Sequence, residues 1–160
     1  MTSITLLCVG KLKEAYWRDA VAEYQKRLAA FCKFDIVELD ECRLPDNPSL
    51  AQIEKALETE GKAILSKIPP RAAVMPLCIE GKPLSSEALS EKLQQWSVSG
   101  TSKIVCIIGS SFGLSPAVKA AATFKLSLSP MTFPHQLARV MLCEQVYRAM
   151  QIAAGGKYHK

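Results

Sequence analysis

The sequence predicts an α/β fold in which a parallel sheet is covered by helices. Short apolar runs of strand length alternate with stretches of helical periodicity, in the order β-α-β-α-β-α-β-α-β-α, which favours a parallel, doubly wound sheet. The chain has 160 residues, a typical length for one domain. It contains no internal repeat and no linker-like segment, so we expect residues 1–160 to form a single domain.

Two strands and two helices are predicted in the first half. The apolar run at residues 4–9 has strand length, and residues 14–31 place apolar side chains three and four apart, as a helix does. A second strand is predicted at residues 34–39. A loop with two prolines follows at residues 40–49, and its last residue, Ser49, can cap a helix that runs to residue 68.

The middle of the chain continues the alternation. Residues 72–79 predict a third strand, in which Pro76 lacks the N–H of a sheet ladder and therefore indicates an edge, a bulge or the end of pairing. A turn is predicted at Gly81-Lys82-Pro83. Ser85 caps the next predicted helix, and residues 103–108 form the fourth predicted strand.

The last third is predicted to hold a loop at residues 109–114, a brief helix at 115–122 and a fifth strand at 124–128. A second loop at residues 129–133 leads to a long final helix, which Pro134 opens and the Gly155-Gly156 pair closes.

The final helix is apolar around nearly its whole circumference. At about 100° per residue, His135 and Arg139 share one edge, and Glu144, Arg148 and Gln151 lie roughly opposite. Such a helix is buried on more than one side. Two explanations stand: it packs against a second copy in a two-fold dimer, or it is sandwiched within its own core.

Composition narrows the class of protein. No apolar run reaches the roughly 18 residues that span a bilayer, and no secretion signal is visible, so we expect a cytoplasmic protein. The six cysteines lack metal-ligand spacing and mostly sit in apolar runs, so we expect core thiols and no metal site. The net charge of +5 combines an acidic block at residues 34–60 with basic flanks. This pattern suits a polyanionic partner or a mixed solvated surface.

Candidate chemistry concentrates at the carboxyl ends of the strands, where parallel sheets bind ligands. Three loops meet there, at residues 77–82, 109–114 and 129–133. The middle loop, GSSFGL, holds two glycines and two hydroxyls but matches neither the dinucleotide nor the P-loop motif; it is either a ligand cradle or a glycine turn.

The C-terminal tail, GGKYHK, joins an aromatic ring and an imidazole to cations, which suits nucleic acid unless the end is disordered. No catalytic triad or paired-carboxylate motif is recognisable. Methyl transfer from S-adenosyl-L-methionine needs neither, because positioning supplies most of the catalysis.

The sequence resembles the RlmH family of SPOUT-class methyltransferases over its whole length. The strongest likeness lies in the segment SLSPMTFPHQLAR at 127–139, the continuation EQVYRA at 144–149 and the ending YHK. The opening VGKLKE at 9–14, the segment YQKRL at 24–28 and the segments EGK and SSE at 80–87 are similar too. The resemblance implies a parallel sheet, a C-terminal trefoil knot and a homodimer built through the final helix.

The resemblance further implies S-adenosyl-L-methionine as cofactor and methylation of N3 of a pseudouridine in 23S rRNA within the 70S ribosome. It places His135, Arg139, Tyr158 and His159 toward the RNA and the acceptor base. The cofactor would be bound, largely through backbone groups, by Leu77, Gly109, Leu128, Ser129, Pro130, Met131, Thr132 and Phe133. Ser110 and Pro130 depart from the pattern common in the family.

Removal of the N3 proton would leave an anion. We expect Arg139 to stabilise that anion and His135 or His159 to accept the proton, because imidazole titrates near neutral pH. Two alternatives remain from the sequence: a methyltransferase of the same class that acts on transfer RNA, and a non-catalytic, cofactor-dependent ribosome-binding factor.

Overall fold

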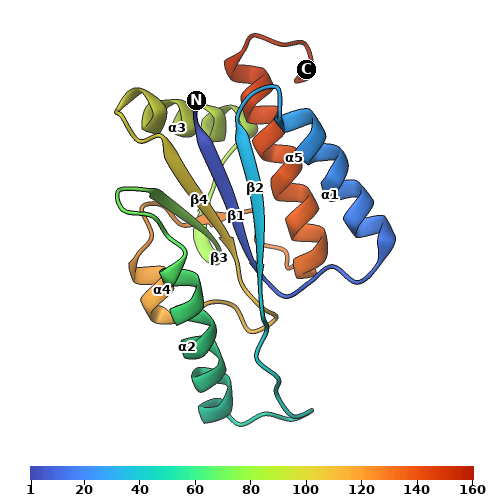
Figure 1. Cartoon of the computed structure of the whole chain (residues 1–160), viewed down its shortest axis with the longest axis vertical. Coiled ribbons are helices and arrows are strands. Elements are labelled where there is room, and N and C mark those ends of the chain that lie inside the picture. Colours follow the sequence, from blue (N-terminus) through green and yellow to red (C-terminus); the bar gives the residue numbers. More distant parts are fainter.

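Five strands and five helices alternate along the chain in the computed structural model, which describes all of residues 1–160 (Figure 1). The strands are β1 (Ser3–Val9), β2 (Lys33–Leu39), β3 (Ala73–Pro83), β4 (Lys103–Ile108) and β5 (Leu126–Ser127). The helices are α1 (Ala15–Leu28), α2 (Leu50–Ser66), α3 (Ser86–Val98), α4 (Pro116–Ala120) and α5 (His135–Ala153). All pairs are parallel, in the order β2-β1-β4-β3-β5, which confirms the predicted fold class.

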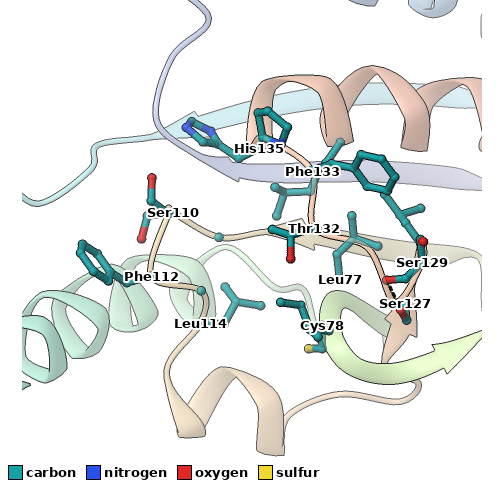
Figure 2. A pocket seen from close by; sticks show the side chains of 18 of the residues that line it. Leu77, Cys78, Ser110, Phe112, Leu114, Ser127, Ser129, Thr132, Phe133 and His135 are labelled. Atoms are coloured by element: carbon teal, nitrogen blue, oxygen red, sulfur yellow. Dashed lines mark hydrogen bonds between the residues drawn. The ribbon is translucent and has the colours of Figure 1, made fainter.

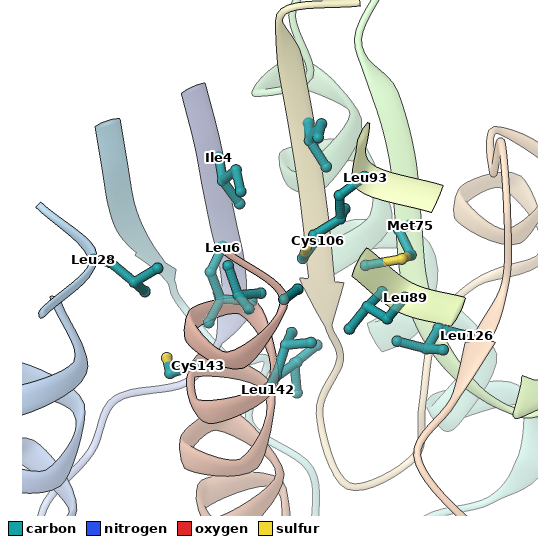
Figure 3. Close-up of a cluster of buried hydrophobic side chains, with 14 of the residues drawn as sticks. Ile4, Leu6, Leu28, Met75, Leu89, Leu93, Cys106, Leu126, Leu142 and Cys143 are labelled. Carbon is teal, nitrogen blue, oxygen red and sulfur yellow. The ribbon is translucent and has the colours of Figure 1, made fainter. Parts of the chain in front are cut away.

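The sheet is covered on both faces, and each central strand contributes side chains to two cores, one on each face. In β1, Ile4 and Leu6 pack into a core with α1, α3 and α5, whereas Leu7 and Val9 pack against α2 and α4 on the other face. Successive side chains of a strand point to opposite faces, so a strand buried on both sides reads as a continuous apolar run. Figure 3 shows the first core, to which α5 contributes Leu142 and Cys143.

Serine side chains begin three of the helices, as the sequence predicts. The hydroxyls of Ser49, Ser85 and Ser115 accept hydrogen bonds from backbone N–H groups in the first turns of α2, α3 and α4. Ser49 also shares a capping box with Gln52, whose side chain accepts the N–H of Ser49.

β3 extends further than predicted, and the predicted turn at residues 81–83 is wrong. Pairing with β4 stops at Pro76, the register then shifts, and Lys82 and Pro83 pair with Leu126 and Ser127 of β5. Pro76 thus marks the end of one ladder, one of the expected outcomes. A Cβ at Gly81 would lie 2.8 Å from the carbonyl oxygen of Lys125, so glycine permits this close pairing.

The final helix, α5, lies between α1 and α3 on one face of the sheet (Figure 1). Its own chain therefore accounts for much of its apolar circumference. Leu137, Met141 and Ile152 are only partly buried and belong to neither core. They leave an apolar stripe on α5, and the homodimer stays a prediction.

All six cysteines are free, and five of them are buried. Burial raises the pKa of the Cys8, Cys106 and Cys143 thiols to about 12, so they act as core side chains. None of the helices combines the length and the apolar character that crossing a bilayer requires.

Candidate functional site

A cavity of about 850 Å³ opens at the carboxyl end of β4, beside residues 77–80 of β3 (Figure 2). The three segments expected to meet at this end of the sheet all contribute to its wall, together with the start of α5, although the first of them, at residues 77–82, is part of β3 and not a loop. Leu77, Gly109, Leu128, Ser129, Met131, Thr132 and Phe133, all expected to bind a cofactor, line it. Pro130 is exposed and is not part of the lining.

Two glycines shape the loop at residues 109–114. The N–H of Gly113 donates to the carbonyl of Ser110 over 2.9 Å, and Gly113 has a φ of +91°, a conformation that favours glycine. A Cβ at Gly109 would collide with the carbonyl oxygen of Gly113. The tight turn and the cavity wall are therefore the same structure.

Serine side chains order the loop that leads into α5. The Ser127 hydroxyl donates to the carbonyl of Ser129 over 3.1 Å, as drawn in Figure 2. The Ser129 hydroxyl in turn accepts the N–H of Met131 over 3.0 Å. These local bonds hold the loop backbone along the cavity.

An ion pair in the cavity wall was not anticipated from the sequence. Lys119 Nζ of α4 lies 2.7 Å from Glu80 Oε1 of β3, and this bond lowers the pKa of the Glu80 carboxyl. The sequence offers one indication of this pair, the positions of its two residues. Glu80 directly follows an apolar strand run, and Lys119 lies on the helix that follows the glycine loop.

His135, at the first position of α5, lines the cavity. Its Nδ1 is buried and has no hydrogen-bond partner. Buried polar atoms are nearly always paired, so this atom is available to a bound group or a water.

The structure corrects the expected placement of Arg139. Its side chain is only 2% exposed, and Nη1 lies 2.6 Å from Glu38 Oε2 of β2. Nη2 donates to the carbonyl of Gly10 over 3.1 Å. A helical wheel places Arg139 on the edge of His135 but cannot reveal that this edge faces the end of β2. The Arg139 side chain is therefore buried and bonded to groups of its own chain.

Tyr158 and His159 form a separate network away from the cavity. Tyr158 donates to Glu144 Oε1 over 2.7 Å, and Arg148 Nη2 lies 3.0 Å from the same oxygen. His159 Nδ1 lies 3.2 Å from Arg148 Nη1, and its Nε2 lies 2.6 Å from Glu87 Oε1 of α3. The tail is thus folded back on α3 and α5.

The network shifts the acidity of its members. Burial acts to raise the pKa of Glu144, but hydrogen bonds from Arg148 and Tyr158 outweigh it and leave that pKa below its usual range. The bond to Glu144 raises the pKa of Tyr158 to about 12, so this hydroxyl stays protonated at neutral pH.

A smaller cavity of about 380 Å³ lies between the tail network and the main cavity. Glu144 is in its wall, and Ser127 and Leu128 line both cavities. The residues expected to act on the acceptor base are therefore divided: His135 is in the main cavity, Arg139 is internal, and Tyr158 and His159 lie beyond the smaller cavity.

Residues 2–159 match the family described as "Predicted SPOUT methyltransferase". The fold is also similar to that of a probable methylase family protein from Haemophilus influenzae Rd KW20, with a TM-score of 0.53. The sequence identity is 11%, and the match covers 99% of this chain and 71% of that protein. At this identity the second likeness concerns the fold alone. The family match covers nearly the whole chain, and the chain belongs to the SPOUT methyltransferase family.

Proposed function

We propose that this SPOUT methyltransferase transfers a methyl group from S-adenosyl-L-methionine to N3 of a pseudouridine in 23S rRNA within the 70S ribosome. The observation that carries the proposal is the main cavity: seven of the eight residues that the RlmH resemblance assigns to the cofactor line it. The resemblance also carries the choice of ribosomal RNA over transfer RNA.

The cavity fits the cofactor in size and chemistry. Its volume of about 850 Å³ lies within the range of roughly 300–1,000 Å³ that is usual for small-molecule sites. Backbone groups of the ordered loops and the unpartnered Nδ1 of His135 offer polar contacts in a partly apolar wall. Bound S-adenosyl-L-methionine supplies an electrophilic methyl group.

The chain's own residues hold the acceptor and remove its proton. His135 accepts the N3 proton in this proposal, because its imidazole is in the cavity wall and its Nδ1 has no hydrogen-bond partner. Arg139 positions the neighbouring backbone at Gly10. Tyr158 and His159 contact the RNA, with Lys157 and Lys160 supplying positive charge for phosphates.

The proposal includes a homodimer formed through α5 and a C-terminal trefoil knot. The partly buried apolar stripe of Leu137, Met141 and Ile152 on α5 supports the dimer. Large apolar side chains are also exposed at the cavity, with Ile79 at 69% and Met131 at 73%. A second surface that covers this end of the molecule would remove them from water.

The test is transfer of a labelled methyl group to intact 70S ribosomes, isolated subunits, naked 23S rRNA and transfer RNA. We expect label at N3 of one pseudouridine and chiefly on 70S ribosomes. Label on transfer RNA alone would contradict the ribosomal substrate, and tight ribosome binding without label would contradict catalysis. Light scattering measures the molar mass in solution and tests the dimer independently.

A further inference from the structure

We propose that Glu60 of α2 is a positioning residue that holds the loop at residues 109–114 in the shape that binds the cofactor. It acts through the hydroxyl of Ser110. The inference rests on the proposed cofactor site, and it assigns a role to a helix that contributes no residue to the cavity wall.

Both carboxylate oxygens of Glu60 are used. Ser110 Oγ donates to Oε1 over 3.0 Å, and the backbone N–H of Cys42 donates to Oε2 over 2.9 Å. The residue is 5% exposed, and no cation forms an ion pair with it. A buried carboxylate costs stability unless such bonds offset the loss of water. An apolar side chain would pack at this position without that cost. The carboxylate is therefore better explained by its hydrogen bond to Ser110 than by packing.

The next residue of α2 grips the other end of the same loop. A Cβ at Gly61 would collide with the Ser115 hydroxyl, so glycine lets α2 and the start of α4 approach closely. Ile64, one turn on, packs with Leu114 and Val118 in the second core. Neighbouring positions of one helix thus anchor both ends of the loop.

The anchored loop is the one whose backbone is expected to face the cofactor. Between its two fixed ends it makes the tight Ser110–Gly113 turn at the cavity, where Figure 2 shows Ser110 and Phe112 on the loop. A loop held in its binding shape before the ligand arrives saves the ordering cost that binding would otherwise include. Loss of the Glu60–Ser110 bond should therefore weaken cofactor affinity through the loop.

The experiment measures S-adenosyl-L-methionine affinity by calorimetry on the full chain without RNA. Ser110→Ala should weaken binding about tenfold, and Glu60→Ala at least as much, because it also loses the bond from Cys42. The double variant should bind no more weakly than Glu60→Ala, because both single variants lack the bond between Glu60 and Ser110. Glu60→Gln should restore affinity, since its amide can accept from Cys42 and donate to Ser110. Glu58→Ala, on the exposed side of α2 and paired only with Lys62, is the matched control and should bind normally.

Additive losses, or unchanged affinity in Ser110→Ala, would overturn the inference. Amide hydrogen exchange in the absence of ligand provides a second readout: in Ser110→Ala the exchange of Gly113 N–H should rise by a larger factor than that of the amides of β1. If Glu60→Ala fails to fold, Ser110→Ala and Glu60→Gln still decide the matter. If the unmodified chain binds no cofactor, the proposed function fails, whereas normal binding with unaffected variants defeats only the role of Glu60.

Discussion

The main cavity and the tail network are held together by different kinds of contact. The cavity is made by short loops whose own glycines and serines set the backbone, with one ion pair in its wall. The tail network joins charged side chains from α3, α5 and the last residues, and His159 reaches Glu87 from 72 positions away. The cavity suits a defined small molecule, whereas the network presents polar groups that can exchange partners.

Deletion of residues 158–160 should have the largest effect. We expect methylation of 70S ribosomes to fall at least 100-fold, because the proposed RNA contacts of Tyr158 and His159 are lost. Cofactor affinity should stay within about twofold, since neither residue lines the main cavity. Labelled methyl transfer and calorimetry measure the two quantities on the same preparation. Unchanged turnover would show that the tail does not act on RNA.

Gly109→Val should give the converse result. The added side chain collides with the Gly113 carbonyl, so the loop must open and cofactor affinity should fall about 100-fold. Ribosome binding by filter retention should change little. Ser102→Ala, just before the other end of β4, is the control. Normal cofactor binding by Gly109→Val would argue that another surface holds the cofactor.

Arg139→Met should act on stability and leave RNA binding intact. Loss of the pair leaves the Glu38 carboxylate, 35% exposed, without its cation, and we expect unfolding free energy to fall by about 2 kcal/mol. Urea denaturation measures this, and Glu38→Gln in the same chain should recover part of the loss. Arg27→Ala breaks an exposed pair with Glu23 and should cost under about 1 kcal/mol. A selective loss of RNA affinity in Arg139→Met would show that Arg139 acts at the acceptor site after all.

The sequence predicts the local features of this molecule well. The helix caps follow from neighbouring residues, and the ends of β1, β2 and β4 lie within one residue of the predicted ones, whereas β3 runs past its predicted end. Seven of the eight cofactor residues that the resemblance implies line the cavity. Long-range pairs escaped prediction. Arg139 meets Glu38 across 101 positions, and Lys82 finds Leu126 only after the register of β3 shifts. Neither pairing leaves a periodic signal, because each depends on how separate elements meet in space.

Tyr158→Phe should have the smallest effect and should depend on pH. The pKa of the Glu144 carboxyl is lower in the folded chain than in the unfolded one. The stability that its ionised form contributes is therefore fully present above the unfolded pKa near 4.5 and is lost as pH falls through the folded pKa. Removal of the Tyr158 hydroxyl deletes one bond to this carboxylate and should cost about 1 kcal/mol at pH 7. The difference in unfolding free energy from the unmodified chain should shrink as pH falls through the folded pKa of Glu144, because a protonated carboxyl needs the donor less. Tyr16→Phe, which alters an exposed ring, should leave the unfolding free energy unchanged at both neutral and low pH. A Tyr158→Phe deficit that persists unchanged at low pH would show that the hydroxyl does not act through the ionised carboxylate. Phe keeps the ring, so packing on Tyr147, 4.9 Å away between centroids, is common to both chains.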